Sequence, residues 1–290
     1  MENNKKLGHL LAIFTIMIWS TTFVSTKILL RTFTPMEILF YRFTLGLLFL
    51  FLMYPKKLKL KDRKEEIYFI FAGLTGVSLY YLLENMALTY SNASNIGVLV
   101  SIAPFFTGML SWIILKEKIN KNFFYGFIIA MTGIILISIK DMSGVKVYPI
   151  GDILAIIAAL IWAFYSLLSR KISTFGYNMI ASTRRMFFYG LIFMILMLPF
   201  FDFTFDLTLF NSKVLIFNIL FLGLCACALC FVTWNISIKI LGTVKTSAYI
   251  YITPVITIIA SFLILKEPIT PVMIIGTILV LSGLFLSEKK

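Results

Sequence analysis

The sequence predicts an all-α membrane protein in which ten transmembrane helices form two inverted five-helix repeats. Three observations lead to this prediction: the composition, the apolar segments and an internal repeat. Of the 290 residues, 60% are hydrophobic and 13% are charged, and the mean hydropathy is +0.97. A soluble domain is about half apolar and about a quarter charged. This chain therefore has more apolar surface than a soluble fold buries, and the lipid bilayer accepts such a composition.

Ten apolar segments are long enough to cross a membrane, which takes about 20 predominantly apolar residues. Most connections between them are short, so consecutive helices are expected to be antiparallel neighbours. The first segment lacks a small-residue cleavage site and is expected to be a helix rather than a signal peptide. In chain order, the predicted spans are residues 9–30, 35–54, 67–90, 95–115, 122–139, 150–169, 177–200, 214–238, 244–265 and 271–287.

The cations in the loops predict the orientation of these spans. With the N-terminus inside, 17 Lys and Arg residues lie on the cytoplasmic side, six of them between residues 56 and 64, and 5 lie outside. Cytoplasmic loops carry the excess of Lys and Arg, so both termini are expected in the cytoplasm. The same placement explains the net charge of +13 without a nucleic-acid partner. Four further cations lie within spans: Lys27, Arg42, Arg184 and Arg185.

An internal repeat relates the two halves of the chain. A shift of 143 residues pairs Gly8 with Gly151, Ile18-Trp19 with Ile161-Trp162, and Arg42 with Arg185. A shift of 150 residues pairs Gly73 with Gly223, Asn85 with Asn235, Pro104 with Pro254, Gly126 with Gly276, and Gly133 with Gly283. Residues 1–140 and 147–290 are therefore predicted to be two five-helix repeats. Because five is odd, the second repeat is inverted in the membrane, a plan typical of secondary transporters.

Several motifs resemble those of the EamA-type transporters of the drug/metabolite transporter superfamily. That family opens with Trp-Gly-x-x-Phe-x-x-x-Lys, followed by Pro and Arg. This chain has Trp19-Ser-Thr-Thr-Phe23-Val-Ser-Thr-Lys27, Pro35 and Arg42. The family's proline and Leu-x-Glu ending of the fourth span are matched twice, by Pro104 with Leu115-Lys116-Glu117 and by Pro254 with Leu265-Lys266-Glu267. The chain departs from the pattern at Ser20, Glu84, Ser166 and Arg170.

The resemblance implies a central cavity between the halves, alternating access, and transport of amino acids or other small metabolites, often outward. Uniport and proton coupling both stay open. Two rival classes also stay open: a membrane enzyme that modifies lipids, and a channel or assembly factor without turnover. The expected partners are a small-molecule substrate and the bilayer of the cell (inner) membrane, with no cofactor. The oligomeric state, a monomer included, is open.

Glu84 is the only acidic residue deep inside a predicted span. A charge at mid-bilayer costs about 2.5–3.5 kcal/mol or more, so it is expected to face protein or water and to have a partner. Tyr80 and Tyr81 lie one turn before it on the same helix face. Two interpretations stand. Either Glu84 binds a proton or a substrate amine during the cycle, or it forms a fixed ion pair with Lys27 or Arg42.

The other charges within spans have comparable alternatives. Arg42 and Arg185 are equivalent in the repeat and are placed to contact substrate carboxylates, because a guanidinium binds a carboxylate through two hydrogen bonds. The alternative is that they snorkel or fasten helices by bonding backbone carbonyls. Lys27 lies near the end of its helix and is expected to snorkel or to pair with Glu37.

Aromatic and polar side chains indicate where a substrate would bind. Trp19 and Trp162 are equivalent in the repeat and lie mid-span, where an indole N–H needs a partner. They are expected to wall a cavity at the midplane together with Tyr81 and Tyr249, since polar groups beside aromatic walls suit a small amphipathic ligand. The alternative is helix packing. The other candidate binding residues are Thr22, Tyr80, Glu84, Asn85, Tyr165, Ser166, Trp234 and Thr253.

Pro104 and Pro254 each remove one backbone hydrogen bond from the fourth and ninth spans. The carbonyl groups of Val100 and Ile250 are then expected to be free. The two prolines are predicted to act as hinges for gating, with static kinks as the alternative.

Little in the sequence indicates metal or catalytic chemistry. The only histidine, His9, lies at the predicted membrane edge. Three cysteines lie in one apolar run, and a spacing of two residues places Cys225 and Cys227 on different helix faces. Together with Cys230 they are predicted to be small packing residues.

Overall fold

The computed structural model describes residues 2–116, 121–139, 149–204 and 206–288, which are helical and contain no strand. Within these ranges, eight helices are long and apolar enough to cross a membrane by length and composition. Two shorter apolar helices, Lys121–Ile137 and Pro271–Ser287, accompany them. The prediction of an all-helical membrane protein is confirmed. Glu117 of the first Leu-x-Glu motif and several loop cations of the orientation argument (Lys118, Lys140, Lys146, Lys289 and Lys290) lie outside the described residues.

Each of the ten apolar segments is one helix or a run of consecutive helical segments. In chain order these are α1 (Glu2–Leu29), α2 (Pro35–Met53), η1 (Arg63–Glu65), α3 (Glu66–Gly73), η2 (Leu74–Leu79), α4 (Tyr80–Tyr90), α5 (Ala93–Val100), α6 (Ala103–Leu115), α7 (Lys121–Ile139), α8 (Pro149–Thr174), α9 (Met179–Met197), η4 (Leu198–Phe200), η5 (Leu207–Asn211), α10 (Lys213–Leu220), η6 (Phe221–Leu229), α11 (Cys230–Leu241), α12 (Thr243–Ser247), η7 (Ala248–Ile252), α13 (Thr253–Ala260), η8 (Ser261–Leu265) and α14 (Pro271–Glu288).

Local sequence explains the start of the second span. The Thr34 side chain accepts a hydrogen bond from the Glu37 backbone N–H (3.3 Å), and the Glu37 carboxylate accepts one from the Thr34 N–H (2.8 Å). This reciprocal pair is a capping box, which satisfies N–H groups that have no partner within the helix. Pro35 follows at the first helical position, where its missing N–H is harmless.

Three spans contain π-helical segments in the described residues, η2, η6 and η8, where the sequence predicts continuous α-helix. The first two each pack against the second helix of the other half of the chain, η2 on α9 and η6 on α2. A Cβ atom at Gly73 would lie 2.5 Å from the Met186 carbonyl oxygen, so the backbones approach more closely than a side chain would allow. The Ser78 hydroxyl also donates to the Gly190 carbonyl across this contact (2.8 Å).

The fourth and ninth spans are interrupted near their prolines. Pro104 and Pro254 stand in the first turns of α6 and α13, so each begins a helix instead of kinking a continuous one. The fourth span is divided into α5 and α6, and the ninth passes through the 3-10 segment η7 before α13. The prediction that the Ile250 carbonyl is free is wrong, because in this tighter turn it accepts the Thr253 N–H.

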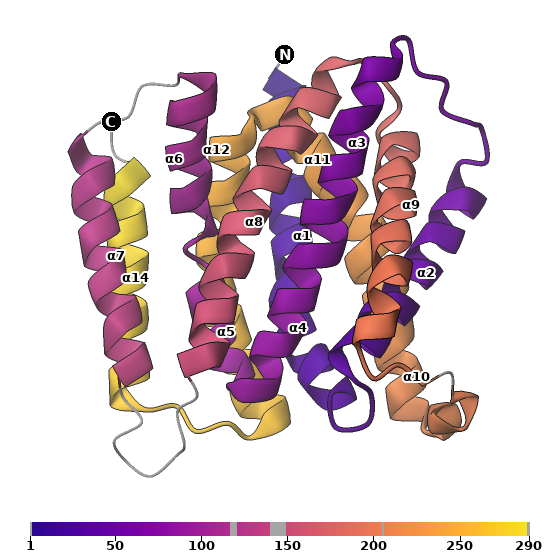
Figure 1. The fold of residues 1–290 in the computed structure, drawn as a ribbon. Coiled ribbons are helices and arrows are strands. Elements are labelled where there is room, and N and C mark those ends of the chain that lie inside the picture. Colours follow the sequence, from indigo (N-terminus) through magenta and orange to yellow (C-terminus); the bar gives the residue numbers. More distant parts are fainter. Residues whose placement is uncertain (1, 117–120, 140–148, 205, 289–290) are drawn as a thin grey trace.

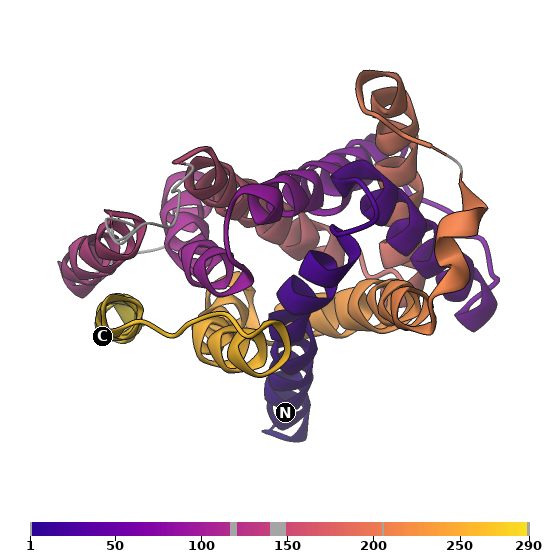
Figure 2. The same ribbon diagram turned by 90° about the horizontal axis from the view of Figure 1, so that it is seen from below.

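The two halves of the chain are interleaved in space (Figures 1 and 2). The first helix, α1, packs against α11 and α13 of the second half, and α8 packs against α4 and α6 of the first half. The start of α1 and the end of α14 lie at the same end of the bundle (Figure 1). The core of the molecule is therefore built from both halves together.

The two shorter apolar helices, α7 and α14, lie side by side at one edge of the bundle (Figures 1 and 2). Glycines form their contact: Gly126 meets Gly283, and Gly133 meets Gly276. The order of these contacts makes the helices antiparallel. A Cβ atom at Gly133 would lie 2.6 Å from the Gly276 carbonyl oxygen, so only glycine allows this spacing.

Replacing Gly133 by Ala is expected to destabilise the protein, because the added methyl group would force α7 away from α14. Overpacking of this kind costs about 1–3 kcal/mol. Thermal unfolding of the purified protein in detergent measures the effect. Ile128→Ala on the same helix is the control, because Ile128 is 61% exposed and its truncation removes little packing. Equal melting temperatures of the two variants would contradict this account of the contact.

Candidate functional site

A narrow cavity lies inside the bundle and is lined by residues of both halves. Its free volume is about 30 Å³, room for one or two water molecules. An amino acid does not fit in this space. We call this space the central cavity. The residues that line it are Ile16, Trp19, Thr22, Phe23, Tyr80, Tyr81, Glu84, Val100, Ala103, Trp162, Ile250 and Thr253.

Both interrupted spans meet the central cavity at their interruptions. Val100 ends α5 and Ala103 begins α6, and Ile250 of η7 and Thr253 at the start of α13 occupy the equivalent positions of the second half. Binding sites of secondary transporters are typically formed by discontinuous helices near the bilayer midplane, because the ends of the half-helices present unpaired backbone groups. The break in each span therefore lies at the cavity wall.

Aromatic rings form much of the remaining wall. Trp19 and Trp162 meet edge to face, with ring centroids 5.2 Å apart, and Tyr80 packs against Trp162 at 4.8 Å. The Trp19 indole N–H donates to the Ala226 carbonyl (2.8 Å). The buried Trp162 N–H has no hydrogen-bond partner among the described residues. A donor with no protein acceptor, on a ring that lines the cavity, is available to a ligand.

Glu84 lines the cavity and is 2% exposed. Its Oε1 atom has no hydrogen-bond partner in the described part of the chain. The fixed ion pair with Lys27 or Arg42, one of the two interpretations of Glu84, is not formed among the described residues: Lys27 bonds backbone carbonyl groups and Arg42 bonds Cys227. The Tyr80 hydroxyl, one turn earlier, interacts with the Glu84 carboxyl group. This buried acid is therefore incompletely satisfied.

Lys27, near the end of α1, bonds backbone carbonyl groups of another helix. Its ammonium group donates to the carbonyl oxygens of Leu88 (2.5 Å) and Ser91 (2.8 Å), which ties α1 to the end of α4. The predicted pairing with Glu37 is wrong, because the Glu37 carboxylate caps α2 and accepts hydrogen bonds from Thr204 (3.0 and 2.8 Å). A long lysine stem can lie along apolar surface while its ammonium group reaches polar atoms at a helix end.

Arg42 is fully buried behind the cavity wall. Its Nε–H donates to the Cys227 thiol sulfur (3.1 Å), and its guanidinium carbon lies 4.3 Å from the centre of the Tyr81 ring. Neither terminal nitrogen has a hydrogen-bond partner in the residues described here. Snorkelling is wrong for this residue, since its charge stays inside the protein. The charge is held by an aromatic face and a sulfur atom.

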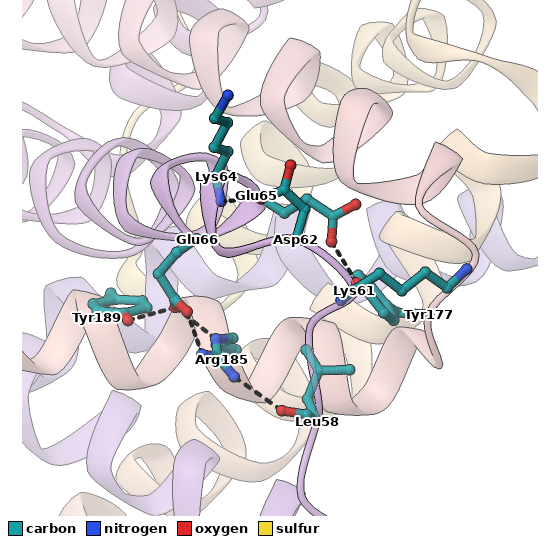
Figure 3. A network of polar contacts seen from close by, with 9 residues as sticks. All are labelled: Leu58, Lys61, Asp62, Lys64, Glu65, Glu66, Tyr177, Arg185 and Tyr189. Carbon is teal, nitrogen blue, oxygen red and sulfur yellow. Dashed lines mark hydrogen bonds and ion pairs between the residues drawn. The ribbon is translucent and has the colours of Figure 1, made fainter.

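Arg185 has a different environment, although it is equivalent to Arg42 in the repeat. Its guanidinium forms a two-point ion pair with Glu66 and donates to the Leu58 carbonyl (3.1 Å) (Figure 3). The Tyr189 hydroxyl also donates to Glu66 (2.5 Å) (Figure 3). The interpretation in which both arginines face one substrate is therefore wrong for Arg185. This residue follows the alternative, because it fastens α9 to α3 and to the loop after α2, away from the central cavity.

Five other predicted binding residues lie outside the cavity lining. The Asn85 amide donates to the Pro35 carbonyl (3.1 Å) and the Ser166 hydroxyl to the Trp162 carbonyl (3.0 Å). The Tyr249 hydroxyl bonds the His9 ring (2.5 Å), so Tyr249 does not wall the cavity. The other two, Tyr165 and Trp234, are fully buried beside it: the Tyr165 hydroxyl donates to Asn235, and Trp234 packs against Trp19.

Two residues beside the cavity carried no sequence signal. Phe231 is buried, and its ring contacts those of Trp19, Tyr81 and Trp162 at centroid distances of 5.6, 5.9 and 6.1 Å. Cys227 was predicted only to pack, but its sulfur is the hydrogen-bond acceptor of Arg42. Nothing in a run of apolar residues distinguishes a ring at the cavity from a ring facing lipid.

The second Leu-x-Glu motif caps the N-terminal end of another span. Lys266 adopts a left-handed conformation (φ 59°) and ends the ninth span. Beyond this turn, the Glu267 carboxylate accepts hydrogen bonds from the backbone N–H groups of Ala93 (2.9 Å) and Ser94 (3.0 Å) and from the Ser94 hydroxyl (2.6 Å). An acidic side chain at a helix N-terminus accepts hydrogen bonds from unpaired backbone N–H groups and interacts favourably with the positive end of the helix dipole. The recurrence of the motif was the signal that could have indicated this role.

Comparison with known proteins gives a consistent result. The chain matches the EamA-like transporter family twice, over residues 6–139 and 149–288. An uncharacterized transporter of Archaeoglobus fulgidus is 27% identical over 288 residues, covering 97% of each chain. An uncharacterized transporter of Clostridium kluyveri is 28% identical, covering 96% of this chain and 92% of the relative. The uncharacterized transporter YyaM of Bacillus subtilis is 27% identical, covering 90% and 87%.

A solved crystal structure of a protein resembles this fold with a TM-score of 0.71 and covers 97% of each chain. The two sequences are 17% identical, so this likeness concerns the fold alone.

Proposed function

The chain belongs to the EamA-like transporter family, and from this premise we propose that it is a secondary transporter of amino acids or related small metabolites. It works by alternating access and exports its substrate. The observation that carries the proposal is the central cavity, which both interrupted spans meet and which Trp19, Trp162 and Glu84 line together. Membership of this family indicates a transporter rather than a lipid-modifying enzyme.

We further propose that residues 1–140 and 147–290 are two inverted repeats of five spans each, which makes ten spans in all. Helix contacts support this, because they recur with the halves exchanged. The contacts of α1 with α11 and α13 correspond to those of α8 with α4 and α6, and α2 with η6 corresponds to α9 with η2. A twofold axis across the pair α7 and α14 would produce an antiparallel contact between the equivalent glycines of the two helices. The observed contact has this form, since Gly126 meets Gly283 and Gly133 meets Gly276.

The cavity chemistry supports a substrate with an amine and an apolar part. A protonated amine would be held by the Glu84 carboxylate and by the faces of the tryptophan rings. A carboxylate on the substrate would be drawn towards the buried Arg42 guanidinium, which lies behind the ring of Tyr81. Thr22 and Thr253 add hydroxyl groups to the wall. An amino acid carries these groups within the reach of one small site.

The narrowness of the central cavity supports a carrier over a channel. A space of about 30 Å³ admits no metabolite, so a transport cycle would need the bundle to rearrange around each molecule. The two interruptions at Pro104 and Pro254 are the proposed hinges, since a proline lacks the N–H that would continue the hydrogen bonding of a helix across the break.

We propose that the protein lies in the cell membrane with both termini in the cytoplasm. The start of α1 and the end of α14 share one end of the bundle, as this orientation requires (Figure 1). The cation-rich segment between residues 56 and 64 lies at the same end and would face the cytoplasm.

Counterflow in proteoliposomes tests the proposal. Vesicles containing the purified protein are loaded with a mixture of amino acids and offered labelled amino acids one at a time, with and without a proton gradient. Transient accumulation of one class is expected for the wild type. If Glu84 carries the coupled proton, Glu84→Gln removes the response to the gradient but retains counterflow.

The control is Asp202→Asn, which neutralises an exposed carboxylate outside the cavity and is expected to behave as the wild type. A gradient response that persists in Glu84→Gln would contradict proton coupling through this residue. Absence of counterflow with every amino acid would contradict the proposed substrate class.

A further inference from the structure

A second pocket lies between α2, the segment that follows it and α9, and it shares no residue with the central cavity. Its volume is about 300 Å³. We call it the interfacial pocket and define it by Phe51, Lys57, Leu58, Arg184, Arg185 and Phe188. It lies at the end of the bundle that holds the start of α1, close to the network of Figure 3.

Three cations line the interfacial pocket, and two of them are held in place by the protein. The Arg184 guanidinium donates to the carbonyl oxygens of Tyr54 and Lys56 and lies 4.5 Å from the centre of the Phe51 ring. Arg185 is held by Glu66, which balances its charge. The pocket therefore keeps an excess of positive charge in a fixed position.

Lys57 differs from the two arginines because it is exposed and its ammonium group has no partner among the described residues. Three N–H groups on a mobile stem are thus available beside a fixed guanidinium. A phosphate group accepts hydrogen bonds from such a pair, and each charge-assisted bond is about twice as strong as a neutral one.

Large apolar side chains stand beside these charges. Phe51 and Phe188 are 45% and 50% exposed on the outside of the bundle, and Leu52 next to them is 81% exposed. In a membrane, such side chains contact acyl chains. A pocket lined by both cations and exposed rings matches a ligand with an anionic head and an apolar tail. Basic pockets between helices on the cytoplasmic side bind anionic lipid head groups elsewhere.

We propose that the interfacial pocket binds an anionic phospholipid, with the phosphate between Lys57 and Arg184 and the acyl chains along Phe51 and Phe188. The lipid comes from the cytoplasmic leaflet if both termini lie in the cytoplasm, so the leaflet rests on the proposed function and orientation. The interfacial pocket does not depend on the identity of the transported substrate. Binding of the lipid to this pocket is measured without any transport assay.

Native mass spectrometry of the full chain in detergent tests the site. The protein is titrated with phosphatidylglycerol, phosphatidylcholine and inorganic phosphate. Phosphatidylglycerol is expected to bind at least fivefold more tightly than phosphatidylcholine. Lys57→Gln is expected to weaken phosphatidylglycerol about fivefold, which corresponds to about 1 kcal/mol for one cation near an anionic lipid. Phe188→Ala is expected to weaken it severalfold through the lost contact with the acyl chains.

The matched control is Lys59→Gln, which removes an exposed cation of the same segment that does not line the pocket. It is expected to leave the affinity unchanged. Equal weakening by Lys57→Gln and Lys59→Gln would mean general attraction to a basic surface and would overturn the proposal. Equal affinities for the two lipids would overturn it as well. Inorganic phosphate that binds as tightly as phosphatidylglycerol would overturn the assignment to a lipid.

Discussion

Replacement of Arg42 by Met is expected to remove most transport while the protein stays as stable as the wild type or becomes more stable. The Arg42 side chain is fully buried, its Nε–H bonds a sulfur atom, and both terminal nitrogens lack partners in the described residues. Exchange of a buried charge for an apolar side chain of similar size is often neutral or stabilising, by up to about 1–4 kcal/mol. A charge kept under such conditions is expected to serve binding rather than stability.

Loss of one charge-assisted contact with the substrate costs about 1.5–3 kcal/mol, which lowers transport by roughly 10- to 150-fold. Counterflow rates per folded molecule and thermal unfolding in detergent measure the two effects separately. Arg185→Met is the matched comparison, because it changes the equivalent residue of the repeat. It breaks the ion pair with Glu66 and is expected to lower stability by about 1 kcal/mol, with transport per folded molecule retained. An Arg42→Met protein that is strongly destabilised, or that transports normally, would contradict a binding role.

Replacement of Trp162 by Phe is expected to lower transport about fivefold with little change in folding. The variant keeps an aromatic ring at the cavity wall and removes the indole N–H, which has no partner among the described residues. A neutral hydrogen bond to the substrate contributes about 1 kcal/mol, hence the expected factor. Counterflow rates at a substrate concentration below saturation measure this loss.

Trp234→Phe is the control for that experiment. Trp234 is also buried, its N–H likewise lacks a partner in the described chain, and its ring packs against Trp19, but it does not line the cavity. The control is expected to transport as the wild type does. If both variants lose transport equally, these tryptophans serve helix packing, and the cavity wall assigned to Trp162 is refuted.

Sequence reasoning found much of the cavity because the repeat marked it. Trp19 and Trp162 were identified as equivalent aromatic residues at mid-span, and both line the central cavity with Tyr80, Tyr81 and Glu84. Glu84 stood out because an acid within an apolar helix is costly and therefore conspicuous. Tyr249 was predicted at the cavity wall but lies away from it, and Phe231, whose ring borders the wall, was not singled out. Helical periodicity states which face a residue occupies but not what lies opposite that face.

Composition and hydropathy by themselves determined that this protein is a bundle of membrane helices, because every backbone polar group in lipid must find a partner within its own segment. The motifs by themselves indicated the family to which the chain belongs. Only the tertiary structure decided which partners and which burial each of two equivalent residues has. Arg42 and Arg185 occupy the same position of the repeat, yet one is buried behind Tyr81 and the other is paired with Glu66. The partner of each side chain comes from a helix far away in the chain, and burial and electrostatics depend on that partner.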